Sequence, residues 1–205
     1  MCRLYIIRLR AMRGTHLISD KENLNDEELW ERMLHKDDEA VSLLYQRYFD
    51  FLYNYGLHVC ADEDVVKDCI QDLFLSLFSL HSTAPIRSVK AYLLLSMRNN
   101  LLASLKERGG YSRVEELEFE LSVSEEDFFH CFGSDDQTKE RLHKLQEAYG
   151  QLNANQRHAI YLRFIKELDW NELGEVLNIS PHSCMNLVGR ALAKLRTMLG
   201  SIVLF

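Results

Sequence analysis

The feature that most constrains this chain is a pair of helix-start signals separated by a short turn near its C-terminal end. Asp169 can accept hydrogen bonds from the first backbone N–H groups of a helix, and Glu172 completes a capping-box pattern three residues later. Asn178 tolerates the left-handed backbone that ends many helices. Ser180 followed by Pro181 then signals a second start. The sequence therefore predicts two helices joined by a tight turn.

Apolar spacing supports both helices and assigns their faces. Leu173, Val176 and Leu177 share one side of the first helix, and Ile179 in the turn is expected to fill the core. The inward positions of the second helix are Cys184, Val188, Ala191 and Leu195. Its outer face is polar, which suits a helix lying in the major groove of DNA. The alternative is an ordinary pair of packed helices that contacts no nucleic acid.

The rest of the chain also favours helix. Its 205 residues include only two prolines and nine glycines, and the 47% apolar share suffices for packed cores. Helix starts are expected at Asn25 or Asp26, at Asp37 and at Asp62. The predicted fold class is all-α, with two small helical domains joined by an acidic flexible linker. The expected segments are a dispensable N-terminal extension over 1–24, a first domain over 25–110, a linker over 111–137 and a second domain over 138–200.

The net charge of −7 argues against DNA binding until its distribution is considered. Residues 25–80 carry 4 basic and 13 acidic side chains, and residues 111–137 carry 1 and 9. The balance reverses to 5 basic and 1 acidic over 81–110, and to 6 and 4 over 151–205. Phosphates respond to local positive charge, so the last two regions remain candidates for contact with nucleic acid.

Several other classes of function find no support in the sequence. The five cysteines include no C-x-x-C pair and are odd in number, which favours reduced thiols in the cytoplasm. His130, Cys131 and His143 match no zinc spacing, so no metal is predicted. No apolar run approaches the length of a membrane span. No catalytic constellation or phosphate loop is visible, so we predict neither enzymatic activity nor a cofactor.

The residues from 151 to 196 resemble a known family. They include LNANQR, IYLRF, WNELGEVLNIS and NLVGRALAKLR. This segment resembles region 4 of the extracytoplasmic-function (ECF) sigma factors of bacterial RNA polymerase, which reads the −35 promoter element. The resemblance implies −35 contacts from Pro181, His182, Ser183, Met185, Asn186, Arg190 and Lys194. Many relatives carry a basic residue in place of Met185 and a larger residue in place of Gly189.

The residues from 62 to 78 resemble sigma region 2.2, in which an aspartate, a glutamine, an acidic residue and a phenylalanine recur in this order. The resemblance implies that this helix binds the coiled coil of the polymerase β′ subunit. The residues expected to bind are Asp68, Gln71, Asp72 and Leu75. Phe74 is expected to pack inside with the stripe of Ile70, Leu73 and Leu77. Without the resemblance, the same polar side would be taken as a solvated helix face.

The basic helix expected over residues 86–108 resembles regions 2.3 and 2.4, which open and hold the −10 element. Contacts are implied for Arg87, Lys90, Tyr92, Arg98, Asn99, Asn100 and Lys106. The family often has tryptophan where Tyr92 stands, and there the ring is largely structural.

Taken together, the chain is identified as a member of the ECF group of the sigma-70 superfamily. The resemblance implies a cytoplasmic, non-enzymatic initiation factor that is not inserted in a membrane. Its expected partners are core RNA polymerase, through the β′ coiled coil and the β flap, promoter DNA, and an anti-sigma factor. The alternative is a conventional helix-turn-helix regulator that acts without docking on polymerase. Such a regulator has no use for both the acidic and the basic helix.

Overall fold

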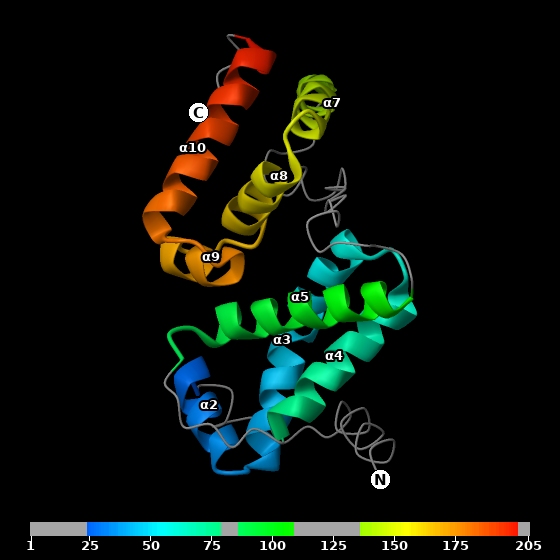
Figure 1. Ribbon diagram of the computed structural model, residues 1–205, viewed down its shortest axis with the longest axis vertical. Coiled ribbons are helices and arrows are strands. Elements are labelled where there is room, and N and C mark those ends of the chain that lie inside the picture. The colour runs from blue at the N-terminus through cyan, green and yellow to red at the C-terminus, as the bar shows by residue number, and fades with distance from the viewer. Residues whose placement is uncertain (1–23, 79–85, 109–135, 201–205) are drawn as a thin grey trace. The chain divides into compact units, whose positions relative to one another are not determined.

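The computed structural model describes residues 24–78, 86–108 and 136–200, and within these ranges all regular structure is helical (Figure 1). The expected all-α fold class is therefore confirmed. The chain divides into two compact units, Met1–Ser104 and Leu105–Phe205. The predicted extension over 1–24 and the predicted linker over 111–137 lie almost wholly outside the described residues, and their boundaries stay predictions.

The first unit contains the helices α2 (Asp26–Leu34), α3 (Asp38–Val59), α4 (Glu63–Phe78) and α5 (Val89–Glu107). Helix α3 packs against both α2 and α4, and Figure 1 shows α5 crossing over α3 and α4. The fully buried side chains come from every helix of the unit, and the largest are Tyr55, Leu29, Leu44, Leu52, Ile70, Leu73, Leu93, Leu94, Met97 and Leu101.

Short polar side chains fix where these helices begin, as the sequence predicts. Asn25 caps α2 in a reciprocal capping box with Glu28. At α4, the Asp62 Oδ1 atom accepts from the Asp64 N–H at 3.0 Å and the Val65 N–H at 3.2 Å. Each bond satisfies a backbone donor that the helix itself leaves without a partner.

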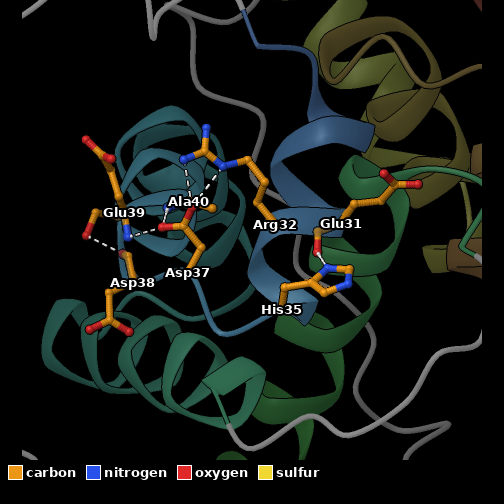
Figure 2. A network of polar contacts seen from close by, with 8 residues as sticks. Glu31, Arg32, His35, Asp37, Asp38, Glu39 and Ala40 are labelled. Atoms are coloured by element: carbon orange, nitrogen blue, oxygen red, sulfur yellow. Dashed lines mark hydrogen bonds and ion pairs between the residues drawn. The ribbon is translucent and has the colours of Figure 1, made fainter.

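The joint between α2 and α3 is built on Asp37 (Figure 2). One carboxylate oxygen accepts from the Glu39 and Ala40 N–H groups at 2.9 and 3.3 Å, which caps α3. The other oxygen accepts from the Arg32 Nε atom at 2.8 Å, and Arg32 Nη2 lies 2.7 Å away. Burial alone would raise the pKa of Asp37, but these hydrogen bonds and the Arg32 charge outweigh it and hold the pKa below its ordinary value.

Gly56 allows the close packing of three helices in this unit. A Cβ atom at this position would stand 2.5 Å from the Val66 Cγ1 atom of α4 and 2.9 Å from the Met97 Cε atom of α5. Both distances are far below van der Waals contact, so only glycine lets α3 approach its neighbours this closely. Nearby, the Trp30 ring of α2 meets the Tyr92 ring of α5 edge-on, with centroids 4.9 Å apart.

The second unit contains α7 (Asp136–Gly150), α8 (Ala154–Ile160), the π-helical turn η2 (Tyr161–Ile165), α9 (Trp170–Leu177) and α10 (Pro181–Leu199). The long helix α10 packs against α7, α8 and α9. Buried apolar residues of α7, of α10 and of the turn after α7 form much of its core, namely Leu145, Ala148, Tyr149, Leu152, Ala191, Leu195 and Leu199. The pattern did not predict η2, in which the Lys166 N–H donates to the Tyr161 carbonyl five residues back, at 3.0 Å.

Replacing Asp37 by Asn tests the joint of α2 and α3. Asn keeps a capping oxygen but loses the charge that pairs with Arg32. Because this pair is part exposed, we expect the free energy of unfolding to fall by only about 0.5 kcal/mol at about pH 6. Asp37→Ala also removes the cap, and should cost about 1 kcal/mol more. Urea denaturation of the three proteins measures both differences.

The pH dependence of this effect follows from the lowered pKa. The ionised carboxylate stabilises the folded protein above the ordinary value of 3.8, and that contribution is lost as pH falls through the lower folded pKa. The difference between wild type and Asp37→Asn should therefore shrink at about pH 3 and below. A difference that stays constant across this range would show that the Arg32 pair does not stabilise the fold.

Candidate nucleic-acid interface

The start of α9 has the predicted capping box. The Asp169 Oδ1 atom accepts from the Asn171 N–H at 2.7 Å and the Glu172 N–H at 2.8 Å, and the Asp169 N–H donates back to Glu172 Oε2 at 2.9 Å. The apolar face of α9 is buried at Leu173 and Val176. This prediction is confirmed, and it fixes where the first helix of the pair begins.

The turn between α9 and α10 also has the predicted left-handed residue. Asn178 has φ 55° and ψ 42°. Its N–H donates to the Glu175 carbonyl at 3.3 Å, and the Ile179 N–H donates to the Gly174 carbonyl at 3.0 Å. Two such bonds around a left-handed residue form a Schellman motif, which satisfies the last carbonyls of α9 and reverses the chain within two residues.

Gly174 is a requirement of this turn that sequence reasoning missed. A Cβ atom at this position would stand 2.8 Å from the carbonyl oxygen of Ile179. That oxygen belongs to the backbone and cannot move aside without opening the turn. The sequence pattern that could have predicted this requirement is a glycine four residues before the left-handed residue. Any larger residue there would clash with the backbone that follows the turn.

The expectation that Ile179 fills the core is wrong, because its side chain is 39% exposed. The backbone of Ile179, rather than its side chain, is the part that contacts α9. Its N–H bonds the Gly174 carbonyl and its own carbonyl lies over Gly174. With both backbone groups turned toward α9, more than a third of the side chain stays exposed.

Helix α10 begins as predicted. The Ser180 Oγ atom accepts from the Ser183 N–H at 3.1 Å, and Pro181 occupies the first turn. The four residues expected to face inward are buried: Cys184, Val188, Ala191 and Leu195. Of the residues predicted to contact the −35 element, Pro181 is half-buried and the rest are exposed: His182, Ser183, Met185, Asn186, Arg190 and Lys194. Helix α10 thus presents a continuous outer face.

Three of these side chains also have bonds within the protein. The Ser183 hydroxyl lies 2.9 Å from the Ser180 hydroxyl, so it takes part in the cap. The Arg190 Nε atom donates to the Asn186 carbonyl at 3.3 Å. The Lys194 ammonium donates to the Gln151 carbonyl between α7 and α8. An ammonium has three donors and a guanidinium five, so both cations retain capacity for phosphates.

The side of α4 predicted to bind polymerase faces outward. Asp68 and Asp72 are exposed, and Gln71 and Leu75 are half-buried. The opposite stripe is buried as expected, at Ile70, Leu73, Phe74 and Leu77. Phe74 packs inside, with its ring centroid 5.1 Å from that of Tyr45. The pKa of the neighbouring Cys69 thiol is raised to about 11, mainly because the thiol is buried and secondly because Asp72 is negatively charged. The thiol is therefore protonated at neutral pH.

The residues predicted to contact the −10 element divide into two groups on α5 and just before it. Arg87, Asn99 and Lys106 are exposed and accessible to phosphates. The others are half-buried: Lys90, Tyr92, Arg98 and Asn100.

The half-buried group makes contacts inside the first unit. The Asn100 Nδ2 atom donates to the Cys69 carbonyl of α4 at 3.3 Å, and Tyr92 packs on Trp30. The Lys90 Nζ atom lies 5.4 Å from the centre of the Phe51 ring. Burial raises the pKa of Tyr55, and the charge of Arg98 opposes that rise, so Arg98 lies close to this buried phenol. These contacts favour a structural role for the group.

Arg163 is a residue of this unit that the sequence reading missed. Its guanidinium carbon lies 4.8 Å from the centre of the Trp170 ring, and its Nη1 atom donates to the Leu168 carbonyl at 2.9 Å. It therefore ties η2 to the start of α9 through a cation–π contact and a hydrogen bond. The pair fixes the direction in which α9 leaves the preceding helix.

In the described ranges, no group of three or more His, Cys, Asp or Glu side chains is placed to hold a metal ion. Among the same residues, no helix is both long enough and apolar enough to cross a membrane.

A family model described as Sigma-70, region 4 matches residues 142–195. The ECF RNA polymerase sigma factor SigM of Bacillus subtilis (strain 168) is 22% identical over 163 residues, which span 78% of this chain and 94% of SigM.

Two solved structures are similar in fold. One is CnrH in complex with the cytosolic domain of CnrY, with a TM-score of 0.56 and 21% identity, covering 87% of this chain and 99% of that chain. The other is the sigma factor RpoE in complex with the anti-sigma factor NepR from Bartonella quintana. It has a TM-score of 0.51 and 21% identity, and covers 78% of this chain and 96% of that chain.

Gly174→Ala tests the turn. The added methyl group would meet the Ile179 carbonyl, so we expect the free energy of unfolding of the second unit to fall by about 2 kcal/mol or more. Gly189→Ala is the matched control, because a Cβ atom there meets nothing within 4 Å. That change should stabilise α10 by about 1 kcal/mol. Thermal unfolding followed by circular dichroism separates the two, and equal effects would contradict the close approach at Gly174.

Proposed function

We propose a function from one premise: the chain belongs to the ECF group of the sigma-70 superfamily. As an RNA polymerase sigma factor, it binds the core enzyme and directs initiation at a specific set of promoters. Its work is recruitment and recognition rather than catalysis. In this proposal the outer side of α4 docks on polymerase, the exposed residues of α5 meet the −10 region, and the outer face of α10 reads the −35 element.

The observation that carries the proposal is the presence in one chain of two different exposed helix faces. Asp68 and Asp72 give α4 an acidic outer side, while α10 presents polar and basic residues from a capped helix-turn-helix. A conventional regulator would need only the second. The similarity to SigM extends over 163 residues, far more than the helix-turn-helix alone, and this favours the sigma factor over the regulator.

The proposed partners follow from the same premise. They are core RNA polymerase, through its β′ coiled coil and β flap, and promoter DNA. An anti-sigma factor is proposed as well, because the RpoE structure holds one bound to a chain of similar fold. With these partners, the proposed location of the protein is the cytoplasm.

The charges on α4 and α10 suggest which residues provide affinity for polymerase and DNA and which provide sequence specificity. Exposed carboxylates on α4 would steer the protein toward a basic surface and fix its orientation there. Arg190 and Lys194 are suited to phosphates, which position a helix without reading sequence. Asn186 has the geometry to bond adenine through its N6 and N7 atoms, and is proposed to carry sequence information.

The decisive experiment is reconstitution. The purified chain is mixed with core polymerase from its own organism, and transcription is measured on fragments of that genome. Start sites that appear only when the chain is present would support the proposal. Binding to DNA without any polymerase-dependent start would favour the conventional regulator instead.

Asp72→Lys tests docking on polymerase. Asp72 is exposed on α4, so reversing its charge should leave the fold intact and abolish co-purification with core polymerase. Asp50→Lys is the matched control. Asp50 is exposed on α3, outside the proposed surface, and the substitution changes the charge by the same amount. Unchanged helical content in both variants, with loss of binding in the first alone, is the expected result. Normal polymerase binding by Asp72→Lys would refute the assignment.

Asn186→Ala and Arg190→Ala test the reading of DNA. Asn186→Ala should relax preference at one base pair of the −35 element, at a cost of about 1–3 kcal/mol there. Arg190→Ala should weaken binding to all sequences alike and reduce the salt slope by about one unit. Both are measured by titrating matched and mutated duplexes at several salt concentrations. The same effect of both changes on every duplex would show that α10 does not read bases.

A further inference from the structure

The first half of α10 carries no formal charge. Residues 181–189 contain no Lys, Arg, Asp or Glu, and the first charged side chain of the helix is Arg190. In helix-turn-helix proteins the N-terminal residues of the second helix reach the base edges. The commonest contact to guanine is a bidentate Arg or Lys. That contact is missing from the part of α10 that would lie deepest in the groove.

What this half of the helix offers instead is an apolar side chain beside an amide. Met185 is 44% exposed, and Asn186 next to it is also exposed. The inner side of the same turns is filled by Cys184 and Val188, so Met185 does not contribute to the core. A single exposed apolar residue is common on protein surfaces, but Met185 lies among the residues that the proposed function places in the groove. In the major groove the apolar group available is the methyl group of thymine.

Gly189 supports this interpretation because it is a small residue where the fold does not require one. At Gly56 and Gly174 an added Cβ atom would collide with the protein, whereas at Gly189 it would meet nothing within 4 Å. Glycine within a helix is unfavourable relative to alanine, and no contact inside the described part of the chain requires it here. It lies one turn beyond Met185 and Asn186 on the exposed side. A bare backbone at this point allows another surface to come close to them.

We propose that α10 reads a thymine through the Met185 side chain, next to the adenine bonded by Asn186, and that Gly189 provides the clearance this contact needs. The inference rests on the proposed −35 function and adds a specificity-determining residue to it. It implies that the central bases of the −35 element contacted by α10 are an adenine and a thymine rather than a guanine. The alternative occupant of this apolar position is a protein partner, which the experiment below separates from DNA.

The test uses deoxyuridine, which differs from thymidine only by the missing methyl group. Duplexes enriched from a random pool by the full chain bound to core polymerase supply the probe, and each thymine is replaced in turn. For wild type we expect one position at which the replacement weakens binding about three- to fivefold, the loss of one buried methyl contact. Met185→Ala should show no loss at that position. Met185→Leu should retain it, and Met185→Gln, similar in length but polar, should lose it.

An enriched sequence with no deoxyuridine effect in wild type, or the same effect in Met185→Ala, would overturn the thymine contact and leave the proposed function standing. If the chain bound to core polymerase enriches no sequence, both are overturned. Gly189→Leu should raise the melting temperature by about 4 °C while weakening binding at least about tenfold. Unchanged binding by that variant would overturn the clearance at Gly189.

Discussion

Hydrogen bonds that the first N–H groups of the helices donate to short polar side chains are the interactions on which both units depend. Asn25, Asp37, Asn153, Asp169 and Ser180 each accept such a bond. A helix start that is held at one residue sets the rotation of every side chain that follows. A shift of one residue would rotate the buried stripe of α10 by about 100° and bring polar side chains into the core.

The turn before α10 adds the second constraint. Because the chain reverses within two residues, α9 and α10 must touch at their ends, and only Gly174 leaves room for the returning carbonyl. The same geometry exposes the outer face of α10 along its whole length, since its inner face is fully occupied by α7, α8 and α9. The proposed recognition surface is therefore a consequence of packing: it consists of the α10 side chains that the core leaves exposed.

The parts that sequence could predict are those encoded locally. The caps, the left-handed Asn178, the inward stripe of α10 and that of α4 all follow from residue type and spacing, and the structure agrees with them. What the sequence did not predict involves partners distant along the chain or the path of the backbone itself. Asn100 donates to a carbonyl of α4, and Arg163 stacks on Trp170. Ile179 is exposed rather than buried, and its backbone faces Gly174. No local pattern records such contacts, so part of the predicted −10 set includes residues that support the fold.

The π-helical turn at Tyr161–Ile165 has a consequence for descent. A π turn contains one more residue than an α turn, so η2 has the geometry of a single-residue insertion at the end of the helix that α8 begins. Removing one residue would change where the chain leaves this helix, and with it the position of Arg163 relative to Trp170. Relatives that lack the turn should align with a one-residue gap in this segment and should have lost the Arg–Trp pair together with it. The π-helical turn and the Arg163–Trp170 pair would then be kept or lost together.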